Sequence, residues 1–281
     1  MEFVPIPLGK FVERIVLWLT DNFSDAFDGI TAVIDVILNQ IDNLLLWLPW
    51  PVNITLFMLL AWRSAGRSTA LMTGVCLYLL GSFGLWEEGM STLALVVTAV
   101  FISILMGLPL GILSARSDRI EKLLRPLLDG MQTIPSFVYL IPAVMFFGIG
   151  NVPGVLSTVI FALPPMVRLT SLGIRQVPEE LIEAALSFGS SDWQMLTKLQ
   201  IPLAMPSIMA GINQTVMMAL SMVVTAAMIG AGGLGGNILF AIQRVELGMG
   251  VEAGLGILFI AIVLDRILQG YSKKLREAKR L

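Results

Sequence analysis

Two long stretches without a charged side chain constrain the fold of this chain more than any other feature. They run from residue 91 to residue 115 and from residue 130 to residue 167. A helix needs about 20 consecutive apolar residues to cross the hydrocarbon core of a bilayer, and both stretches exceed that length. Inside a bilayer every backbone polar group must be paired within the protein. The sequence therefore predicts an all-α fold, a polytopic bundle of membrane-spanning helices.

The overall composition agrees with a membrane protein and excludes several kinds of site. Hydrophobic residues make up 56% of the chain and charged residues 14%, whereas soluble domains average about 25% charged residues. The chain contains no histidine, so His-dependent triads and His metal sites are excluded, and we predict neither catalytic residues nor metal ligands. The single cysteine, Cys76, lies in an apolar run and is interpreted as a small buried residue. A net charge of −2 gives no indication of nucleic-acid binding.

Hydropathy and helix-breaking residues divide the region 44–270 into about seven predicted spans. Pro49 and Pro51 are expected to bend the first span, and Asp265 and Arg266, near the end of the last, are expected to pair with each other. The glycine-rich turn at 148–154 is expected to divide the charge-free stretch 130–167 into two spans. The predicted spans are 44–62, 68–83, 91–115, two within 130–167, 205–230 and 248–267.

Small residues predict close contacts between some of these spans. Gly107 and Gly111 have the spacing that lets two helix backbones approach, and so do Gly250 and Gly254. Either pair could form a contact within one subunit or between two subunits.

Residues 1–43 differ from the rest because charges recur too often for a span. Lys10 and Arg14 stand against seven acidic residues, and apolar residues recur on one side of two possible amphipathic helices. Such helices lie in the plane of a membrane interface. The region is interpreted either as a membrane-surface scaffold or as helices that pack against the bundle. At the other end of the chain, residues 271–281 are predicted to form a basic cytoplasmic tail.

Lysine and arginine residues are concentrated in alternate loops of the seven-span arrangement. Cytoplasmic loops carry an excess of these residues, and the excess sets the orientation of a membrane protein. We therefore predict a multi-pass protein of the cell membrane with its N-terminus outside and its C-terminus in the cytoplasm. The residues that place these loops inside are Arg63, Arg67, Arg116, Arg119, Lys122, Arg125, Arg168, Arg175, Lys198 and five residues between 273 and 280.

The longest polar interruption in the second half of the chain, residues 176–206, is predicted to be a helix–turn–helix. Pro178 followed by Glu179 is typical of a helix start. Gly189 stands where a C-terminal glycine would end that helix, and the sequence 191–194 is typical of a capping box that starts a second one. Pro202 and Pro206 are expected to break or redirect the chain before it re-enters the membrane.

This segment resembles the EAA loop of the permease subunits of bacterial ABC importers. The resemblance rests on the sequence Glu-Ala-Ala at 183–185, on Gly189 and on Pro202 at the family's spacing, although Leu199 and Ile201 are exchanged relative to the usual order. In that family the loop is a cytoplasmic coupling helix that docks in a groove of the ATPase subunit. The alternative is an ordinary surface helix–turn–helix. The resemblance implies ATPase-coupling roles for Glu183, Ala184, Ala185, Phe188, Gly189 and Trp193.

Three further segments narrow the resemblance to one group of importers. The sequences MQTIPSFVYLIPAVMFFGIG, FALPPMVRLT and GINQTVMMALSMVVTAAMIGAGGLG are similar to permeases for glycine betaine and proline betaine. The similarity extends from about residue 90 to the end of the chain. It implies a partnership with an ABC ATPase subunit, an extracytoplasmic substrate-binding protein and a second copy of the permease. The partner ATPase would use ATP and magnesium, and this chain would bind no cofactor.

Polar side chains within the spans suggest a path for a small solute. Such groups must find partners in neighbouring helices or line a water-filled pathway, and the sequence leaves both interpretations open. An aromatic cage for a quaternary amine is expected in the binding protein, because the Trp and Tyr residues of this chain are scattered. The candidate pathway residues are Gln132, Thr133, Phe137, Tyr139, Asn213, Gln214 and Ser221.

Two alternative functions remain open from the sequence. The chain has no phosphate-binding G-x-x-x-x-G-K-[ST] motif, so we predict that it is not an enzyme and that ATP hydrolysis belongs to a partner. A permease of this kind could instead carry another small solute, such as choline, carnitine or proline. A secondary transporter or a channel for osmolytes would need no ATPase partner.

Overall fold

The computed structural model describes residues 7–277, and every regular element within that range is helical, as predicted. The long helices are α1 (Leu8–Trp47), α4 (Trp86–Arg116), α7 (Asn151–Arg175), α10 (Ile201–Ser221) and α13 (Leu247–Glu277). The shorter elements are α2 (Trp50–Ala65), α3 (Arg67–Ser82), α5 (Asp118–Thr133), α6 (Phe137–Phe147), α8 (Glu179–Ser187), α9 (Asp192–Gln194), the π-helix η1 (Met195–Gln200), α11 (Val223–Ala227) and α12 (Leu234–Arg244).

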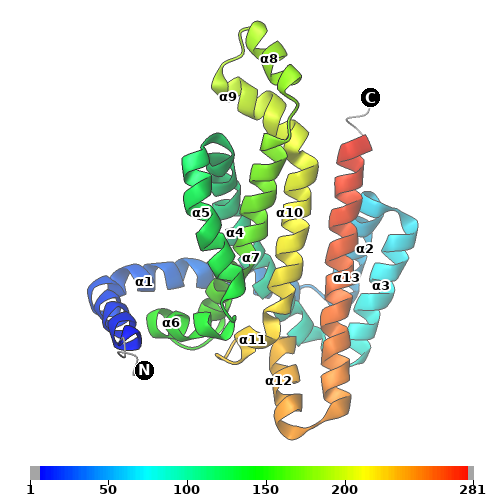
Figure 1. Ribbon diagram of the computed structural model, residues 1–281. Coiled ribbons are helices and arrows are strands. Elements are labelled where there is room, and N and C mark those ends of the chain that lie inside the picture. The colour runs from blue at the N-terminus through cyan, green and yellow to red at the C-terminus, as the bar shows by residue number, and fades with distance from the viewer. Residues whose placement is uncertain (1–6, 278–281) are drawn as a thin grey trace, which may run out of the picture.

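Helices α4, α7 and α10 pack against one another at the centre of the bundle (Figure 1). Helices α5 and α6 lie on one side of this centre, and α2, α3 and α13 lie on the other. Met90, Val96 and Met166 are fully buried within it. Close approach of α4 to α7 depends on two glycines, because a Cβ atom on Gly107 would lie 2.7 Å from the Cγ of Met166 and one on Gly111 2.5 Å from the Cβ of Thr170.

The first predicted glycine pair therefore forms a contact within one subunit. The second pair differs, because a Cβ on Gly254 would meet no atom of the described residues within 4 Å. Within that part of the chain Gly254 forms no close helix contact, so a contact between subunits remains open for it.

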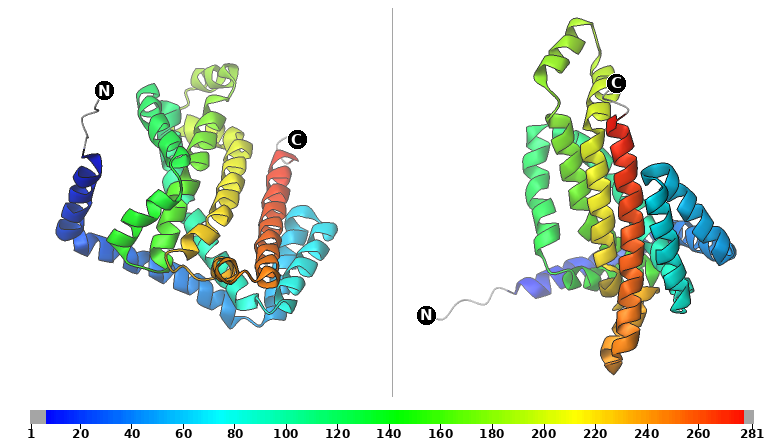
Figure 2. Two further views of the ribbon diagram at one scale, coloured as in Figure 1. Left: turned by 60° about the horizontal axis from the view of Figure 1, so that its bottom comes forward. Right: turned by 90° about the vertical axis from the view of Figure 1, so that its right-hand side faces the viewer.

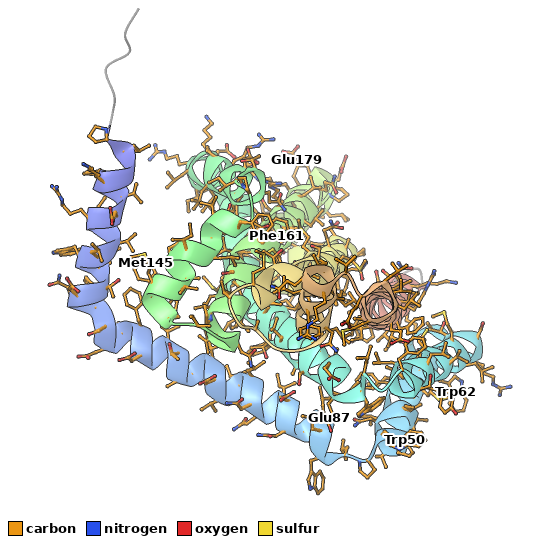
Figure 3. All side chains as sticks on the ribbon, turned by 90° about the horizontal axis from the view of Figure 1, so that it is seen from below. Trp50, Trp62, Glu87, Met145, Phe161 and Glu179 are labelled. Carbon is orange, nitrogen blue, oxygen red and sulfur yellow. The ribbon has the colours of Figure 1, made fainter. Side chains whose placement is uncertain are left out.

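Helix α1 lies across the ends of the other helices instead of running beside them (Figures 2 and 3). It is one element with a kink at Phe23, where two separate amphipathic helices were predicted. Beyond the kink it passes from α6, marked by Met145 in Figure 3, to α2, marked by Trp50. The ring of Phe27 stacks on that of Phe146 at 4.6 Å, and the hydroxyl of Ser91 donates to Asp42 at 2.9 Å. The region therefore packs against the bundle.

The predicted first span, 44–62, is wrong. Helix α1 ends at Trp47, Leu48 is extended, and α2 begins only at Trp50. A residue before proline is disfavoured in the helical region, and proline itself is tolerated in the first turn, so Pro49 and Pro51 separate two helices and do not bend one. The side chain of Asn53 donates to the carbonyl of Leu48 at 3.1 Å and fixes the junction.

The predicted fourth span is also corrected. It does not begin at Gly130, because α5 already starts at Asp118 and carries the charged residues that were assigned to a loop. Ile134, which precedes Pro135, is extended, and α5 and α6 meet there at 100°. Two short helices thus replace one straight span. The division at 148–154 is confirmed, since α6 ends at Phe147 and α7 begins at Asn151.

Length and composition qualify five helices as membrane spans, or up to six if the bent α5–α6 pair counts as one span. This is fewer than the seven predicted. Helices α2 and α3 have 16 residues each, about 24 Å at 1.5 Å per residue, which is shorter than the roughly 30 Å of hydrocarbon. Helix α1, predicted to be interfacial, passes the same test although it is the least buried of the five.

The last two spans are shifted relative to their predicted limits. Helix α10 starts at Ile201 and includes Pro206, so neither Pro202 nor Pro206 breaks the chain; the wider turns of η1 precede them. Helix α13 continues through 271–277, where a separate basic tail was predicted. Residues 1–6 of the predicted N-terminal region and 278–281 of the predicted tail lie outside the described residues.

Candidate functional site

The predicted helix–turn–helix is present and extends beyond the bundle, at the end where the C-terminus lies (Figures 1 and 2). We call the segment from α8 to η1, residues 179–200, the coupling hairpin. Helix α8 begins directly after Pro178, with Glu179 and Glu180 in its first turn. Acidic side chains at this position complement the positive end of the helix dipole.

A glycine in a left-handed conformation ends α8. Gly189 has a φ of 78°. Its N–H donates to the carbonyl of Leu186 at 2.8 Å, and the N–H of Ser190 donates to that of Ala185 at 3.0 Å. This pair of hydrogen bonds is the Schellman motif, which requires positive φ at the glycine position. The predicted role of Gly189 in the turn is therefore confirmed.

The second helix of the hairpin begins with the predicted capping box. The hydroxyl of Ser191 accepts from the N–H of Gln194 at 3.3 Å, and the side chain of Gln194 accepts from the N–H of Ser191 at 3.0 Å. Helix α9 then continues into η1 and α10 without a loop. Any displacement of the hairpin is therefore passed directly to α10, one of the central helices.

The outer surface of the coupling hairpin presents apolar side chains to its surroundings. Phe188 is 92% exposed and Trp193 is 69% exposed. Glu183 and Ala184 are also exposed, and Ala185 is half-buried. Large exposed aromatic residues next to a rigid turn are typical of a protein–protein contact. The six predicted coupling residues thus lie on this one hairpin.

The inner surface of the hairpin contacts the bundle through residues that were not predicted from the sequence. Ile182 and Leu186 line a cavity of about 520 Å³ between the hairpin and the end of α4. Across this cavity the guanidinium of Arg116 donates to the backbone carbonyl of Asp192 at 2.9 Å. Arg116 was counted only as a positively charged loop residue. Arg116 stands at the end of a span and beside the hairpin. This position is the signal that could have identified its role.

Two further arginines join α7 to α5, one of them near the base of the hairpin. Arg175 pairs with Asp118 at 2.8 Å and with Glu121 at 2.9 Å. Arg168 pairs with Asp129 and donates to the side-chain oxygen of Gln132 at 2.8 Å. Each of these two arginines bridges α5 and α7, and Arg175, the last residue of α7, holds the start of α5 next to the hairpin.

The candidate pathway residues of α5 and α6 mostly bond to nearby backbone. The hydroxyl of Tyr139 donates to the carbonyls of Gly130 and Met131 at 3.1 and 2.9 Å, and that of Thr133 donates to the carbonyl of Asp129 at 2.9 Å. Gln132 contacts α10 as well, through the sulfur of Met218 at 3.3 Å.

The remaining candidates divide between two faces of the bundle. Phe137 on α6 and both Gln214 and Ser221 on α10 are exposed in the single chain. Asn213 instead donates to Asp265 of α13 at 2.9 Å. The structure therefore does not bring the seven residues together around one path.

The contacts of Asp265 also differ from the predicted pair with Arg266. Its carboxylate accepts from Asn213 and from Gln269 at 2.7 Å, so it joins α10 to α13. A carboxylate within a span is stabilised by such amide donors when no cation is suitably placed.

Comparisons with known proteins agree with this arrangement. Residues 107–277 match the family described as "Binding-protein-dependent transport system inner membrane component". The chain is 53% identical over 271 residues to the glycine betaine/proline betaine transport system permease protein ProW of Escherichia coli (strain K12), covering 96% of this chain and 77% of that protein. It is 47% identical to the glycine betaine/carnitine transport permease protein GbuB of Listeria monocytogenes, covering 96% of each.

A solved structure shares the fold. The inward-facing MetNI methionine ABC transporter matches with a TM-score of 0.58 and 21% identity, over 69% of this chain and 95% of that chain. At this level of identity the match concerns the fold alone. The family match and the relatives together cover almost the whole chain. The chain therefore belongs to the family of inner membrane components of binding-protein-dependent transport systems.

Proposed function

We propose that the chain is the membrane permease of an ATP-driven importer and that it is coupled to a separate ATPase subunit through the coupling hairpin. The observation that carries this proposal is the hairpin itself. It extends beyond the bundle, is rigid at both of its caps, exposes Phe188 and Trp193, and continues directly into α10. The chain supplies the path, and the partner uses ATP and magnesium.

The distribution of charge supports an orientation with the hairpin in the cytoplasm. The α2–α3 turn, the α4–α5 turn and the end of α13 carry most of the basic residues and lie at the hairpin end of the bundle. Lys274, near the end of α13, donates to the carbonyl of Arg63 at the end of α2, which brings two of these groups together. Positive residues favour the cytoplasmic side, so α1 and α12 lie at the external side.

A second copy of the chain would complete the pathway. Gln214 and Ser221 lie on α10, a membrane helix, yet both are exposed in the single chain, as is Phe137 of α6. Polar side chains at such depth face protein or water, not lipid. We infer that this face of α6 and α10 meets the same face of a second copy and that the solute passes between them.

The transported solute is proposed to be glycine betaine or a closely related compound. The relatives are named for glycine betaine, proline betaine and carnitine. These compounds share a fully alkylated cationic nitrogen and a carboxylate. Aromatic cages bind such a nitrogen by cation–π attraction, and we expect the cage in the binding protein.

Reconstitution tests the proposal directly. The chain is purified with its ATPase, placed in liposomes and supplied with the binding protein and labelled glycine betaine. We expect uptake that requires ATP. Uptake driven by an ion gradient without the ATPase would indicate a secondary transporter, and steady conductance in a planar bilayer would indicate a channel; either result would overturn the proposal. A photo-crosslinker at position 193 is expected to reach the ATPase.

A further inference from the structure

A cavity of about 570 Å³ lies at the end of the bundle opposite the coupling hairpin, where α2 and α4 begin and α3 ends (Figures 1 and 3). Its volume falls within the range of about 300–1,000 Å³ that is typical of small-molecule pockets. Aromatic rings from all three helices line it, namely Trp50 of α2, Tyr78 of α3 and Trp86 of α4. Two adjacent carboxylates, those of Glu87 and Glu88, line it as well.

Neither carboxylate has a cationic partner within residues 7–277. In that range the side chains of Glu87 and Glu88 form no ion pair and no hydrogen bond, and no lysine or arginine lines the cavity. Acidic side chains in a first turn complement the helix dipole, and Glu179 and Glu180 are an equivalent pair at the start of α8. The pair on α4 differs because it faces a cavity with aromatic walls.

The aromatic rings of the cavity also lack a cation from the described part of the chain. At the other end of α2, the guanidinium carbon of Arg67 lies 5.9 Å from the centre of the Trp62 ring, so there the protein supplies its own cation. Among the described residues no such contact forms over Trp50, Tyr78 or Trp86. Ring faces and carboxylates attract the same kind of group, so the cavity suits an ammonium ion.

The position of the cavity indicates that this ammonium group belongs to a membrane lipid. Leu71, Val75 and Tyr78 recur at helical spacing on α3 and are all more than half exposed, so they form an apolar stripe that leads to the cavity. Membrane helices expose such a face to acyl chains, and Trp and Tyr are enriched where the chains meet the headgroups. A lipid whose chains lie along this stripe places its headgroup at the cavity.

A dissolved betaine fits the cavity less well. A single methylene separates the carboxylate of glycine betaine from its cationic nitrogen, so Glu87 and Glu88 would repel it, and no described residue that lines the cavity is basic. In an amine-bearing phospholipid the phosphate is separated from the nitrogen by an ethylene bridge and an ester oxygen. This longer spacing leaves the phosphate outside the cavity.

We propose that this cavity binds the cationic amine headgroup of a membrane phospholipid. The ammonium group lies against the rings of Trp50 and Trp86, its charge is balanced by Glu87 and Glu88, and the acyl chains lie along the apolar stripe of α3. Such a site is separate from the proposed function, because neither ATP nor the transported solute is involved in it.

Native mass spectrometry of the full chain in detergent tests the site. Phosphatidylethanolamine, phosphatidylcholine and phosphatidylglycerol with identical acyl chains are titrated separately. We expect the two amine lipids to bind at least fivefold more tightly than phosphatidylglycerol, which has no amine, and Glu87→Gln/Glu88→Gln to lose this preference. Glu179→Gln/Glu180→Gln is the matched control, because it removes the same two charges from the first turn of α8 and should retain the preference. An unchanged preference in the α4 variant, or an equal loss in the α8 variant, overturns the proposal.

A second pair of variants tests the rings without changing any charge. Trp50→Leu is expected to weaken the binding of phosphatidylcholine at least threefold, whereas Trp62→Leu, at the other end of α2 and similarly exposed, is not. Equal effects of the two substitutions would overturn the assignment of the rings. Choline binding to the lipid-free chain distinguishes the source of the ammonium group: weaker binding than that of phosphatidylcholine supports a lipid, and tighter binding overturns it in favour of a dissolved cation.

Discussion

The turns after α8 and after α12 have the same hydrogen-bond pattern at opposite ends of the molecule. After α8, Gly189 donates to the carbonyl of Leu186, and Ser190 donates to that of Ala185. After α12, Val245 donates to the carbonyl of Ile242 at 3.4 Å, and the next residue donates to that of Ala241 at 2.9 Å. Both are Schellman motifs, and both need a residue with positive φ at the same position.

The difference lies in the residue that occupies this position. Gly189 adopts φ 78° without steric cost, and a capping box follows at once, so the turn after α8 is relaxed and well defined. Val245 adopts φ 57° against its preference. A relaxed turn suits an element that must transmit force in a fixed geometry.

The largest effect is expected when the relaxed turn is given the residue type of the strained one. Gly189→Val places a β-branched side chain at positive φ, at a cost of about 1–2 kcal/mol, and the angle between α8 and α9 must change to relieve it. We expect glycine betaine uptake to be abolished while the protein remains in the membrane. Uptake by reconstituted transporter, with the membrane content measured by immunoblot, checks this.

Gly84→Val is the control for that experiment. Gly84 also has positive φ, 75°, and an added Cβ would meet no atom of the described residues within 4 Å, as at Gly189. The two substitutions introduce the same local strain, but Gly84 lies in the α3–α4 turn, at the end of the bundle opposite the coupling hairpin. Equal loss of uptake in both variants would show that strain alone is responsible and would count against a coupling role for Gly189.

The turn after α8 could be predicted from the sequence better than the turn after α12, for a physical reason. Pro178, Gly189 and Ser191 each have a strong local preference that agrees with the final structure, so the helix start, the turn and the cap follow from local sequence alone. Val245 has the opposite preference, and no residue signals a turn there. The 11-residue helix α12 before it was therefore missed.

Long-range contacts account for the other differences. The 100° bend between α5 and α6 and the lie of α1 across the bundle depend on packing between remote segments. The partners of Arg116 and Asp265 lie 76 and 52 residues away. Composition identifies such residues as charged and near a membrane boundary, but it does not specify which helix they meet. The predicted coupling residues share one hairpin because they are close in sequence, whereas the predicted pathway residues had no such constraint.

A smaller effect is expected when the tether of the coupling hairpin is removed. Arg116→Ala eliminates the hydrogen bond to the carbonyl of Asp192, which is exposed, so its contribution is about 0.5–1.5 kcal/mol. We expect the number of solutes transported per ATP to fall about threefold, with ATP hydrolysis little changed. Arg119→Ala is the control, because Arg119 is an exposed arginine in the first turn of α5, close to Arg116 in the sequence, and this hydrogen bond does not involve it.

An unchanged ratio of transport to hydrolysis in Arg116→Ala would indicate that the hairpin keeps its position through η1 and α10 alone. The turn between α12 and α13 would then resemble the hairpin more closely, since both would be held only by the helices that carry them. A ratio that falls in both arginine variants would point to a general effect of surface charge.

The smallest expected effect is on thermal stability. The midpoint of unfolding should rise for a substitution in the turn after α12 and fall for one in the turn after α8. Val245→Asn relieves a left-handed valine without removing buried contacts, because the side chain is exposed, and asparagine is tolerated at positive φ. We expect the midpoint of thermal unfolding to rise by about 1–3 °C, the size of shift that roughly 1 kcal/mol produces in a protein of this length. Gly189→Ala should lower the midpoint by a similar amount, because alanine at positive φ is disfavoured. If Val245→Asn instead lowers the midpoint, the valine stabilises the turn within the subunit and is not a source of strain.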